Sequence, residues 1–221
     1  MTNPLRLIIN FKNYSDASGE RTIELAKTAE QIAGKYKMRI AVAPPRSKLA
    51  EAVKYSSSVL AQYPDVSGYY TPEYLNNIGV SGSLINHSDH RIPKYEVSNL
   101  VERLEKLNMI SIVCVKDAAE AGNYAKMRPS YIAVEPPDLI GGNRAVSRAM
   151  PDVVAEAVGL VRRASNGHTE VLCGAAIKNG EDASESLDLG ATGVLVHSAI
   201  MKARDWRHVI GDIASGLNRK A

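Results

Sequence analysis

The sequence predicts an α/β protein in which eight parallel strands and their connecting helices close into one (β/α)8 barrel. Short β-branched runs alternate along the chain with amphipathic helical patterns, and most of these runs are apolar throughout. Strands that are apolar on both faces are typical of a parallel sheet covered by helices on each side. We expect a single domain over residues 1–221, because no Ser/Gly linker or change in composition divides the chain.

Eight short runs have the composition of buried strands, and Pro or Gly breakers mark many of the joints between them. The expected strands are Leu5–Asn10, Met38–Ala43, Ser58–Gln62, Gly82–Asn86, Ile110–Val115, Tyr131–Val134, Glu170–Cys173 and Gly193–Val196. Eight strand-and-helix units within 221 residues favour a closed barrel. An open, doubly wound sheet is the alternative arrangement of the same elements.

Segments between these runs repeat apolar residues every three or four positions, which is the period of an amphipathic helix. Three stripes show it well: Val97, Leu100, Val101, Leu104 and Leu107; Val154, Ala157, Val158 and Val161; and Trp206, Val209, Ile210, Ile213 and Leu217. We expect these apolar faces to pack on the outside of the sheet.

Composition narrows the classes of function. The chain is 45% hydrophobic and 23% charged, and its net charge is only +3. Basic and acidic residues are interleaved, which argues against a nucleic-acid partner, and no apolar stretch approaches the roughly 20 residues that span a bilayer. Residues 1–6 lack the apolar region of a signal peptide, and both cysteines, Cys114 and Cys173, lie in apolar runs. We expect a cytoplasmic protein with buried free thiols and no membrane partner.

In a barrel of this kind the chemistry lies at the carboxyl ends of the strands. Glu135 directly follows the expected strand Tyr131–Val134 and precedes two prolines and a glycine-containing loop. A carboxylate at a strand end beneath such a loop is the arrangement of a general base under a closing lid. An ordinary glutamate at a loop edge is the alternative, and reactive residues at the other strand ends argue against it.

Two of those residues are Lys12 and His87. Lys12 comes just after the first expected strand, so its ammonium must find an anion or lie in solvent. His87 comes just after the fourth, in the segment Asn86–Arg91. His87, Asp89 and His90 could also suggest a metal site, but no other strand end offers a cluster of histidine or cysteine ligands.

The last two expected strands end in small residues. The seventh is followed by Gly174, Ala175 and Ala176, and the eighth by His197 and Ser198, where the pattern predicts the start of a short helix. Backbone N–H groups at such turns bind phosphate without side-chain charge, and in barrels the loops after strands seven and eight are the usual phosphate site. The residues thus suggest a base, a histidine, a lysine and a phosphate cradle.

Several segments together resemble triosephosphate isomerases, in particular the short archaeal-type branch of that family. The matching segments occur in order over nearly the whole chain: Asn10-Phe11-Lys12, Asn86-His87-Ser88, Tyr131–Pro137, Leu139–Gly142 and Cys173-Gly174-Ala175. The resemblance implies interconversion of glyceraldehyde 3-phosphate and dihydroxyacetone phosphate through an enediolate, without a cofactor or a metal. It also implies the pairing of a glutamate base with a neutral histidine that is characteristic of this family.

The resemblance further implies a role for each site residue. Glu135 is expected to be the base, His87 the proton shuttle, Lys12 the electrostatic stabiliser and Asn10 an orienting group. Neutral imidazole is expected at His87, because Ser88 and Asp89 look like the start of a helix. The residues expected to bind substrate and phosphate are Asn10, Phe11, Lys12, Ile140, Gly141, Ala176, His197 and Ser198, with residues 138–146 closing as a lid.

Three departures from the family pattern stand out. Asp89 replaces the usual glutamate after His-Ser, so we expect a less direct hold on Lys12. His197 stands where a small residue is usual, and its titration could make phosphate binding sensitive to pH. The loop between Gln62 and Tyr74 looks shorter than the family's intersubunit loop. We still expect a homo-oligomer, with a dimer favoured over a tetramer and a monomer as the alternative.

Two other functions stay open at this point. Another phosphate-binding barrel enzyme, such as a sugar-phosphate epimerase or a tryptophan-pathway isomerase, would use the same fold. A non-catalytic barrel that binds a phosphometabolite would need neither Glu135 nor the pair of Lys12 and His87.

Overall fold

The structure is a computed structural model that describes residues 4–13, 19–142 and 144–218, and these form a parallel (β/α)8 barrel. Its strands are hydrogen-bonded in the order β2-β1-β8-β7-β6-β5-β4-β3. Between β2 and β3 the sheet closes through one parallel bridge, Val42 to Val59, and the Val42 N–H donates to the Ser58 carbonyl at 3.0 Å. The strands are β1 (Leu5–Asn10), β2 (Arg39–Ala43), β3 (Leu60–Ala61), β4 (Gly82–Ile85), β5 (Ile110–Val115), β6 (Tyr131–Val134), β7 (Glu170–Cys173) and β8 (Gly193–Val196). The predicted barrel is confirmed, and the open sheet is wrong.

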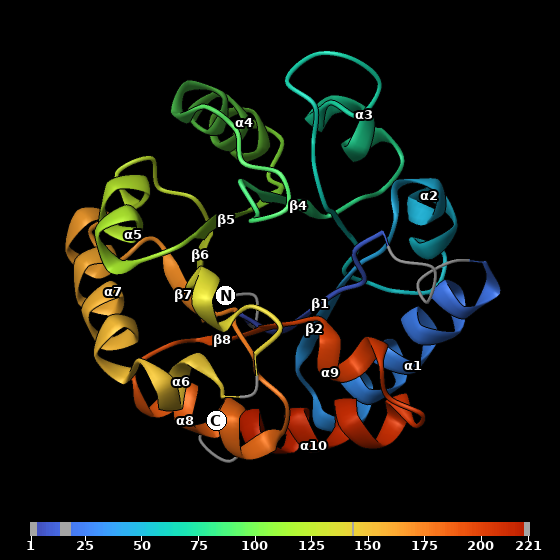
Figure 1. The fold of residues 1–221 in the computed structure, drawn as a ribbon. Coiled ribbons are helices and arrows are strands. Elements are labelled where there is room, and N and C mark those ends of the chain that lie inside the picture. Colours follow the sequence, from blue (N-terminus) through green and yellow to red (C-terminus); the bar gives the residue numbers. More distant parts are fainter. Residues whose placement is uncertain (1–3, 14–18, 143, 219–221) are drawn as a thin grey trace.

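Helices form a ring outside the strands (Figure 1). Within the described part of the chain, none of them has the length and apolar character needed to cross a membrane. The α-helices are α1 (Glu20–Tyr36), α2 (Leu49–Ala52), α3 (Pro72–Asn77), α4 (Lys94–Lys106), α5 (Ala118–Ala125), α6 (Val146–Ala149), α7 (Pro151–Ala164), α8 (Gly180–Asp188), α9 (Ser198–Met201) and α10 (Trp206–Asn218), and two 3-10 turns are η2 (Arg46–Lys48) and η3 (Pro137–Leu139).

Three strands are shorter than the sequence predicts. The fourth stops at Ile85 because Asn86 adopts a left-handed backbone with φ 60°, where its side chain accepts from the Ile92 N–H and donates to the Cys114 carbonyl. The second begins at Arg39, one residue later than expected. The third contains only two residues, because its neighbour β2 pairs with this segment through a single bridge.

Two layers of apolar side chains make the core. One layer fills the inside of the barrel and includes Leu5, Ile8, Cys114 and Leu195, whereas the larger layer lies between the strands and the helices. Leu5 and Ile8 are three residues apart, so strict alternation would place them on opposite faces. A register shift between Leu5 and Leu7 in the pairing of β1 with β2 lets both point inward.

The predicted helical stripes pack as expected on the outside of the strands. The stripe of α4 is buried from Val97 to Leu104, and Leu107 caps the helix while half-buried. In α7 and α10 most residues of each stripe are buried, and the partly buried ones, Val158, Trp206 and Val209, pack against the same layer. This packing holds the carboxyl ends of the strands together at one mouth of the barrel.

Helices α8 and α10 approach each other closely at Gly216. A Cβ atom added there would lie 1.9 Å from the Gly180 carbonyl oxygen, so the helices must move apart to accept alanine. We expect Gly216→Ala to destabilise the fold by about 2 kcal/mol, the typical cost of overpacking. Urea unfolding followed by circular dichroism measures this difference.

Gly211 in the same helix provides the matched control. The nearest atom to an added Cβ there is the Tyr36 hydroxyl at 3.9 Å, so alanine fits. Gly211→Ala should raise stability by about 0.5 to 1 kcal/mol, because alanine loses less backbone entropy in a helix. Equal effects of the two substitutions would contradict the close approach of α8 and α10.

Candidate active site

Polar side chains from the ends of β1, β4 and β6 meet in one cavity at the mouth of the barrel. The cavity encloses about 530 Å³, part of it open to solvent. Loops after β7 and β8 complete its wall. Its lining residues are Asn10, Lys12, His87, Glu135, Ile140, Gly141, Gly142, Gly174, Ala176, Ile177, Lys178, Leu195, Val196, His197, Ser198 and Ala199.

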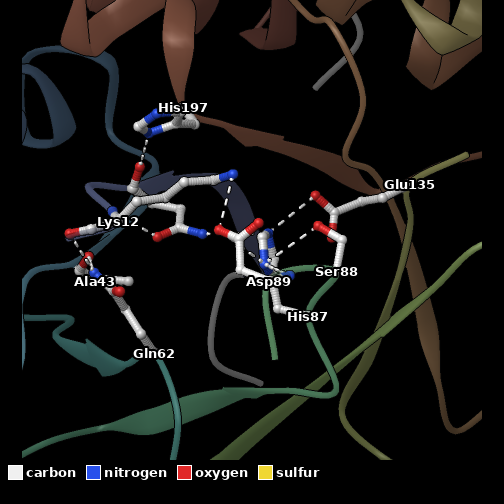
Figure 2. Close-up of polar contacts among 9 residues, drawn as sticks. Lys12, Ala43, Gln62, His87, Ser88, Asp89, Glu135 and His197 are labelled. Carbon is white, nitrogen blue, oxygen red and sulfur yellow. Dashed lines mark hydrogen bonds and ion pairs between the residues drawn. The ribbon is translucent and has the colours of Figure 1, made fainter. Parts of the chain in front are cut away.

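Lys12 is held in a left-handed turn directly after β1. Its φ is 52°, a conformation that costs a non-glycine residue energy and persists only where the surroundings enforce it. The Lys12 N–H donates to the Asn10 side-chain oxygen at 3.0 Å. The Gln62 side-chain amide donates to the Lys12 carbonyl at 3.0 Å and to the Ala43 carbonyl at 2.9 Å. The backbone on both sides of Lys12 is therefore fixed (Figure 2).

The Lys12 ammonium forms an ion pair with Asp89 across the cavity. Lys12 Nζ lies 3.0 Å from Asp89 Oδ2, and the lysine side chain is only 10% exposed. The Asp89 side chain is 41% exposed, so the lysine is shielded from water while its partner carboxylate stays in contact with solvent. The expectation that the shorter Asp89 holds Lys12 less directly is wrong, because the pair is in direct contact.

His87 is buried at the end of β4 with its two ring nitrogens in different surroundings. Its Nδ1 accepts the Asp89 backbone N–H at 3.2 Å, which assigns the proton of a neutral ring to Nε2. Its Nε2 lies 3.5 Å from Glu135 Oε1 and 3.5 Å from Asn10 Nδ2. The expected helix start at Ser88 is wrong: a turn follows His87, and α4 begins only at Lys94. The backbone donor therefore fixes the tautomer of a neutral ring without a helix start.

Glu135 continues β6 by one hydrogen bond, from its N–H to the Val115 carbonyl at 2.8 Å, and its side chain is 6% exposed. It packs over Gly174, where an added Cβ would lie 2.4 Å from Glu135 Cγ. The Cys114 thiol lies beneath it, and burial, followed by the Glu135 carboxylate, raises the pKa of that thiol well above its usual value. Among the described residues, no nitrogen or oxygen pairs with Glu135 Oε2.

His197 closes the side of the cavity formed by β8. Its Nδ1 lies 2.7 Å from the Asn10 carbonyl oxygen, which can only accept, so Nδ1 carries a proton. Burial lowers the pKa of His197, and the nearby Lys12 and His87 lower it further, while the Asn10 carbonyl and Asp89 act in the opposite direction. The predicted short helix after His197 is present as α9.

The loop between β6 and α6 forms the roof of the cavity. It starts as the 3-10 turn η3, and Ile140, Gly141 and Gly142 face the cavity. Its far end is fixed: the Val146 N–H donates to the Ala175 carbonyl at 3.0 Å, and Arg148 pairs with Glu185 at 2.7 Å. Asn143, inside the expected lid, lies outside the described residues.

The cavity contains every predicted site residue except Phe11. Phe11 is fully buried in the layer between strands and helices, so its side chain does not face the cavity. Reasoning from the sequence missed Lys178, which lies in the loop after β7 and lines the cavity. A signal was available, because a lysine shortly after a strand end is the pattern that identified Lys12. The same reasoning also counted Gly174 among the small residues of a phosphate turn, whereas the Glu135 side chain occupies the space beside Gly174.

No group of three or more histidine, cysteine, aspartate or glutamate side chains suited to a metal ion occurs in the described part of the chain. His87 Nδ1 takes the Asp89 N–H, and the His90 N–H donates to the His87 carbonyl at 2.8 Å. This segment is thus a hydrogen-bonded turn, and the metal alternative for His87, Asp89 and His90 has no support in its geometry.

Comparison with known proteins shows the family to which this chain belongs. The family model described as triosephosphate isomerase matches residues 5–213. The chain belongs to the triosephosphate isomerase family. The triosephosphate isomerase of Cenarchaeum symbiosum is 46% identical over 96% of this chain and 97% of its own length. That of Methanothermus fervidus is 36% identical over 98% of this chain and 100% of its own length. The family predicted from the motifs is confirmed.

Solved structures support the fold independently of the family. A mandelate oxidase variant with an FMN adduct superposes with a TM-score of 0.70 at 15% identity, covering 97% of this chain and 72% of the other. A flavocytochrome b2 variant with sulfite bound also gives 0.70, at 16% identity over 97% of this chain and 62% of the other. At such low identity the likeness concerns the barrel alone.

The contact between Glu135 and Gly174 can be tested by adding one methyl group. Gly174→Ala should push the Glu135 carboxylate away from His87, because the new Cβ would overlap Glu135 Cγ. A displacement of about 1 Å should lower kcat by on the order of 10²-fold in a triose-phosphate isomerase assay. The thermal midpoint, measured in parallel, separates this effect from unfolding, and an unchanged kcat would show that the base does not depend on Gly174.

The lowered pKa of His197 predicts a pH-dependent contribution to stability. The pKa of His197 in the fold lies below its value in the unfolded chain. As the pH falls from neutral, the unfolded chain therefore binds a proton at this residue before the folded protein does. Wild type should therefore lose stability relative to His197→Asn as the pH falls below about 6.5, the ordinary pKa of an unfolded histidine. Urea unfolding of both proteins at several pH values measures the difference. A difference independent of pH would contradict the depressed pKa.

Proposed function

We propose that the protein interconverts D-glyceraldehyde 3-phosphate and dihydroxyacetone phosphate by proton transfer through an enediolate. The observation that supports it most directly is the meeting of Glu135 Oε1 and His87 Nε2, 3.5 Å apart, in a cavity that also contains the Lys12 ammonium. A carboxylate base, an imidazole donor and a fixed cation are the groups that aldose–ketose isomerisation requires.

Glu135 is the proposed base. It removes the proton next to the substrate carbonyl and returns it to the neighbouring carbon, so one carboxylate serves both carbons in turn. Its position over Gly174 and its burial keep the carboxylate close to the cavity, where water competes little for it. A base must lie within hydrogen-bond reach of its proton, so both the length and the direction of this side chain matter.

His87 is the proposed proton shuttle between the two substrate oxygens. Because Nδ1 accepts the Asp89 N–H, a neutral ring presents Nε2–H toward the cavity. This N–H donates to the carbonyl oxygen and strengthens its interaction as negative charge develops on that oxygen. Lys12 stabilises the same charge electrostatically, and Asn10, with Nδ2 3.5 Å from His87 Nε2, orients the oxygen side of the substrate.

The phosphate is proposed to bind between the Lys12 ammonium and the loops after β6, β7 and β8. Ile140, Gly141, Ala176, His197 and Ser198 line this region. The Ile140 N–H donates to the Pro137 carbonyl at 3.2 Å in this structure, and the backbone N–H groups of the other four residues are proposed to supply donors without side-chain charge. Closure of residues 138–146 over the phosphate would exclude water and protect the enediolate from losing phosphate. The fixed far end at Val146 and Arg148 provides the pivot for this movement.

A cytoplasmic location and assembly as a homo-oligomer, with a dimer favoured over a tetramer, are part of the same proposal. Cys114 and Cys173 are free and buried, as suits a reducing compartment. The loop after β3 presents Tyr69 with 88% of its surface exposed. Arg46 stiffens this loop by pairing with Asp65 at 2.9 Å and lying over the Tyr70 ring at 4.8 Å. A rigid loop with an exposed aromatic tip is suited to contact a second subunit.

A coupled assay with glyceraldehyde 3-phosphate tests the activity on wild type and two Glu135 variants. Glu135→Gln keeps the shape but cannot accept the proton, so turnover should fall by about 10³-fold or more. Glu135→Asp retracts the carboxylate by about 1 Å and should lower kcat by on the order of 10²-fold.

The two variants also distinguish the alternatives. A different phosphate-binding barrel enzyme would not isomerise glyceraldehyde 3-phosphate even as wild type. A barrel that only binds a phosphometabolite would show no isomerisation, and Glu135→Gln would not change its behaviour in the assay. Wild-type turnover in both variants would remove Glu135 from the role of base.

A further inference from the structure

The His197 side chain extends the contact between β8 and β1 beyond the sheet. Backbone pairing of these strands ends at Ile9 with Val196. One residue further on, His197 Nδ1–H donates to the Asn10 carbonyl at 2.7 Å (Figure 2). An imidazole thus supplies the donor that the strand backbone no longer provides.

This hydrogen bond completes the fixation of one peptide group. The peptide between Asn10 and Phe11 has its carbonyl bound by His197 from β8, and its N–H donates to the Ala43 carbonyl of β2 at 3.0 Å. Rotation of this peptide would break both bonds. The turn that follows it therefore has a defined direction of departure from the barrel.

Lys12 depends on that direction. The Asn10 side-chain oxygen accepts the Lys12 N–H, and Lys12 has the left-handed backbone described above. Its ammonium is almost buried and lies 3.0 Å from Asp89, so it cannot compensate freely for a displaced backbone by changing its own conformation. A change in the orientation of the Asn10 peptide would therefore displace Lys12 Nζ.

We propose that His197 is a positioning residue for Lys12, acting through the Asn10 carbonyl by means of its Nδ1–H donor. The proposal rests on the proposed function, in which Lys12 stabilises the oxyanion and the phosphate. The donor is present on both the neutral and the protonated ring, so the positioning persists when His197 titrates.

Three substitutions separate the donor from the rest of the ring. In His197→Asn the side-chain NH₂ stands as many bonds from the backbone as Nδ1 and can reach the Asn10 carbonyl. His197→Gln places its amide one bond further out, and His197→Ala has no donor. All three keep the backbone N–H of residue 197, so a backbone contact to phosphate is unchanged.

The variants are compared by kcat and KM for glyceraldehyde 3-phosphate, with thermal midpoints measured in parallel. We expect His197→Ala and His197→Gln to lose about 10-fold or more in kcat/KM, since displacement of a charged group by less than 1 Å has effects of this size. Both a higher KM and a lower kcat should contribute, because Lys12 acts on the bound substrate and on the transition state. His197→Asn should stay within about threefold of wild type, by the same argument.

Affinity for inorganic phosphate, measured by isothermal titration calorimetry, gives a readout that does not need turnover. His197→Ala and His197→Gln should bind phosphate about fivefold more weakly than wild type, and His197→Asn about equally. A wild type that binds phosphate but does not isomerise would end the proposed function and leave this comparison intact.

Three results would overturn the positioning role. His197→Ala with wild-type kcat/KM and phosphate affinity would show that Lys12 needs no help from residue 197. An equal loss in His197→Asn and His197→Ala would assign the effect to the missing ring rather than to its donor. Lowered thermal midpoints with unchanged kinetics and phosphate affinity would reduce His197 to a stabilising contact.

Discussion

The burial of the Lys12 ammonium is the constraint on which the rest of the site depends. A cation removed from water is tolerated only where an anion and well-placed hydrogen bonds compensate for the lost hydration. Asp89, at the end of β4, supplies an anion 3.0 Å away, and the fixed turn after β1 directs the ammonium toward it. The ion pair therefore links strand ends on different sides of the barrel mouth. Asp89 stays partly exposed, so an incoming anion can share the cation without first breaking into a closed interior.

The side chain of Glu135, the proposed base, is held mainly by packing. Glu135 lies against Gly174, and their backbones are joined through β6, where the Gly174 N–H donates to the Val134 carbonyl at 2.9 Å. Any residue larger than glycine at 174 would occupy the space of the glutamate side chain. Packing fixes the direction of the carboxylate while leaving Oε2 without a nitrogen or oxygen partner among the described residues. A carboxylate held in this way can accept a proton at Oε2 without first losing a hydrogen bond to a nitrogen or oxygen donor.

The sequence predicted the barrel and the bounds of five of its eight strands, because apolar runs bounded by breakers are a local pattern. Runs such as Tyr131–Val134 are apolar along their whole length and are bounded by breakers, so their limits could be read directly. The sequence-based prediction failed for features that depend on contacts between distant parts of the chain. Nothing local shows that β2 and β3 meet at one bridge, or that Gly174 lies beneath a glutamate 39 positions earlier in the chain. The supposed helix start at Ser88 failed because Pro93 caps the real helix, five residues later.

The same burial that fixes these side chains also limits the charges that the cavity presents at neutral pH. The Cys114 thiol lies below Glu135, and its raised pKa keeps it protonated, so it adds no second negative charge beneath the base. His197 has a lowered pKa and is neutral under the same conditions, so it adds no positive charge beside Lys12. Both groups lie near charged residues, but as neutral groups they interact with them only through their dipoles. The charged groups that these neutral neighbours leave at the cavity are Glu135, the ion pair of Lys12 with Asp89, and Lys178 in the loop after β7. A carboxylate and fixed cations lining one cavity are the arrangement that the proposed proton transfer on an anionic substrate requires.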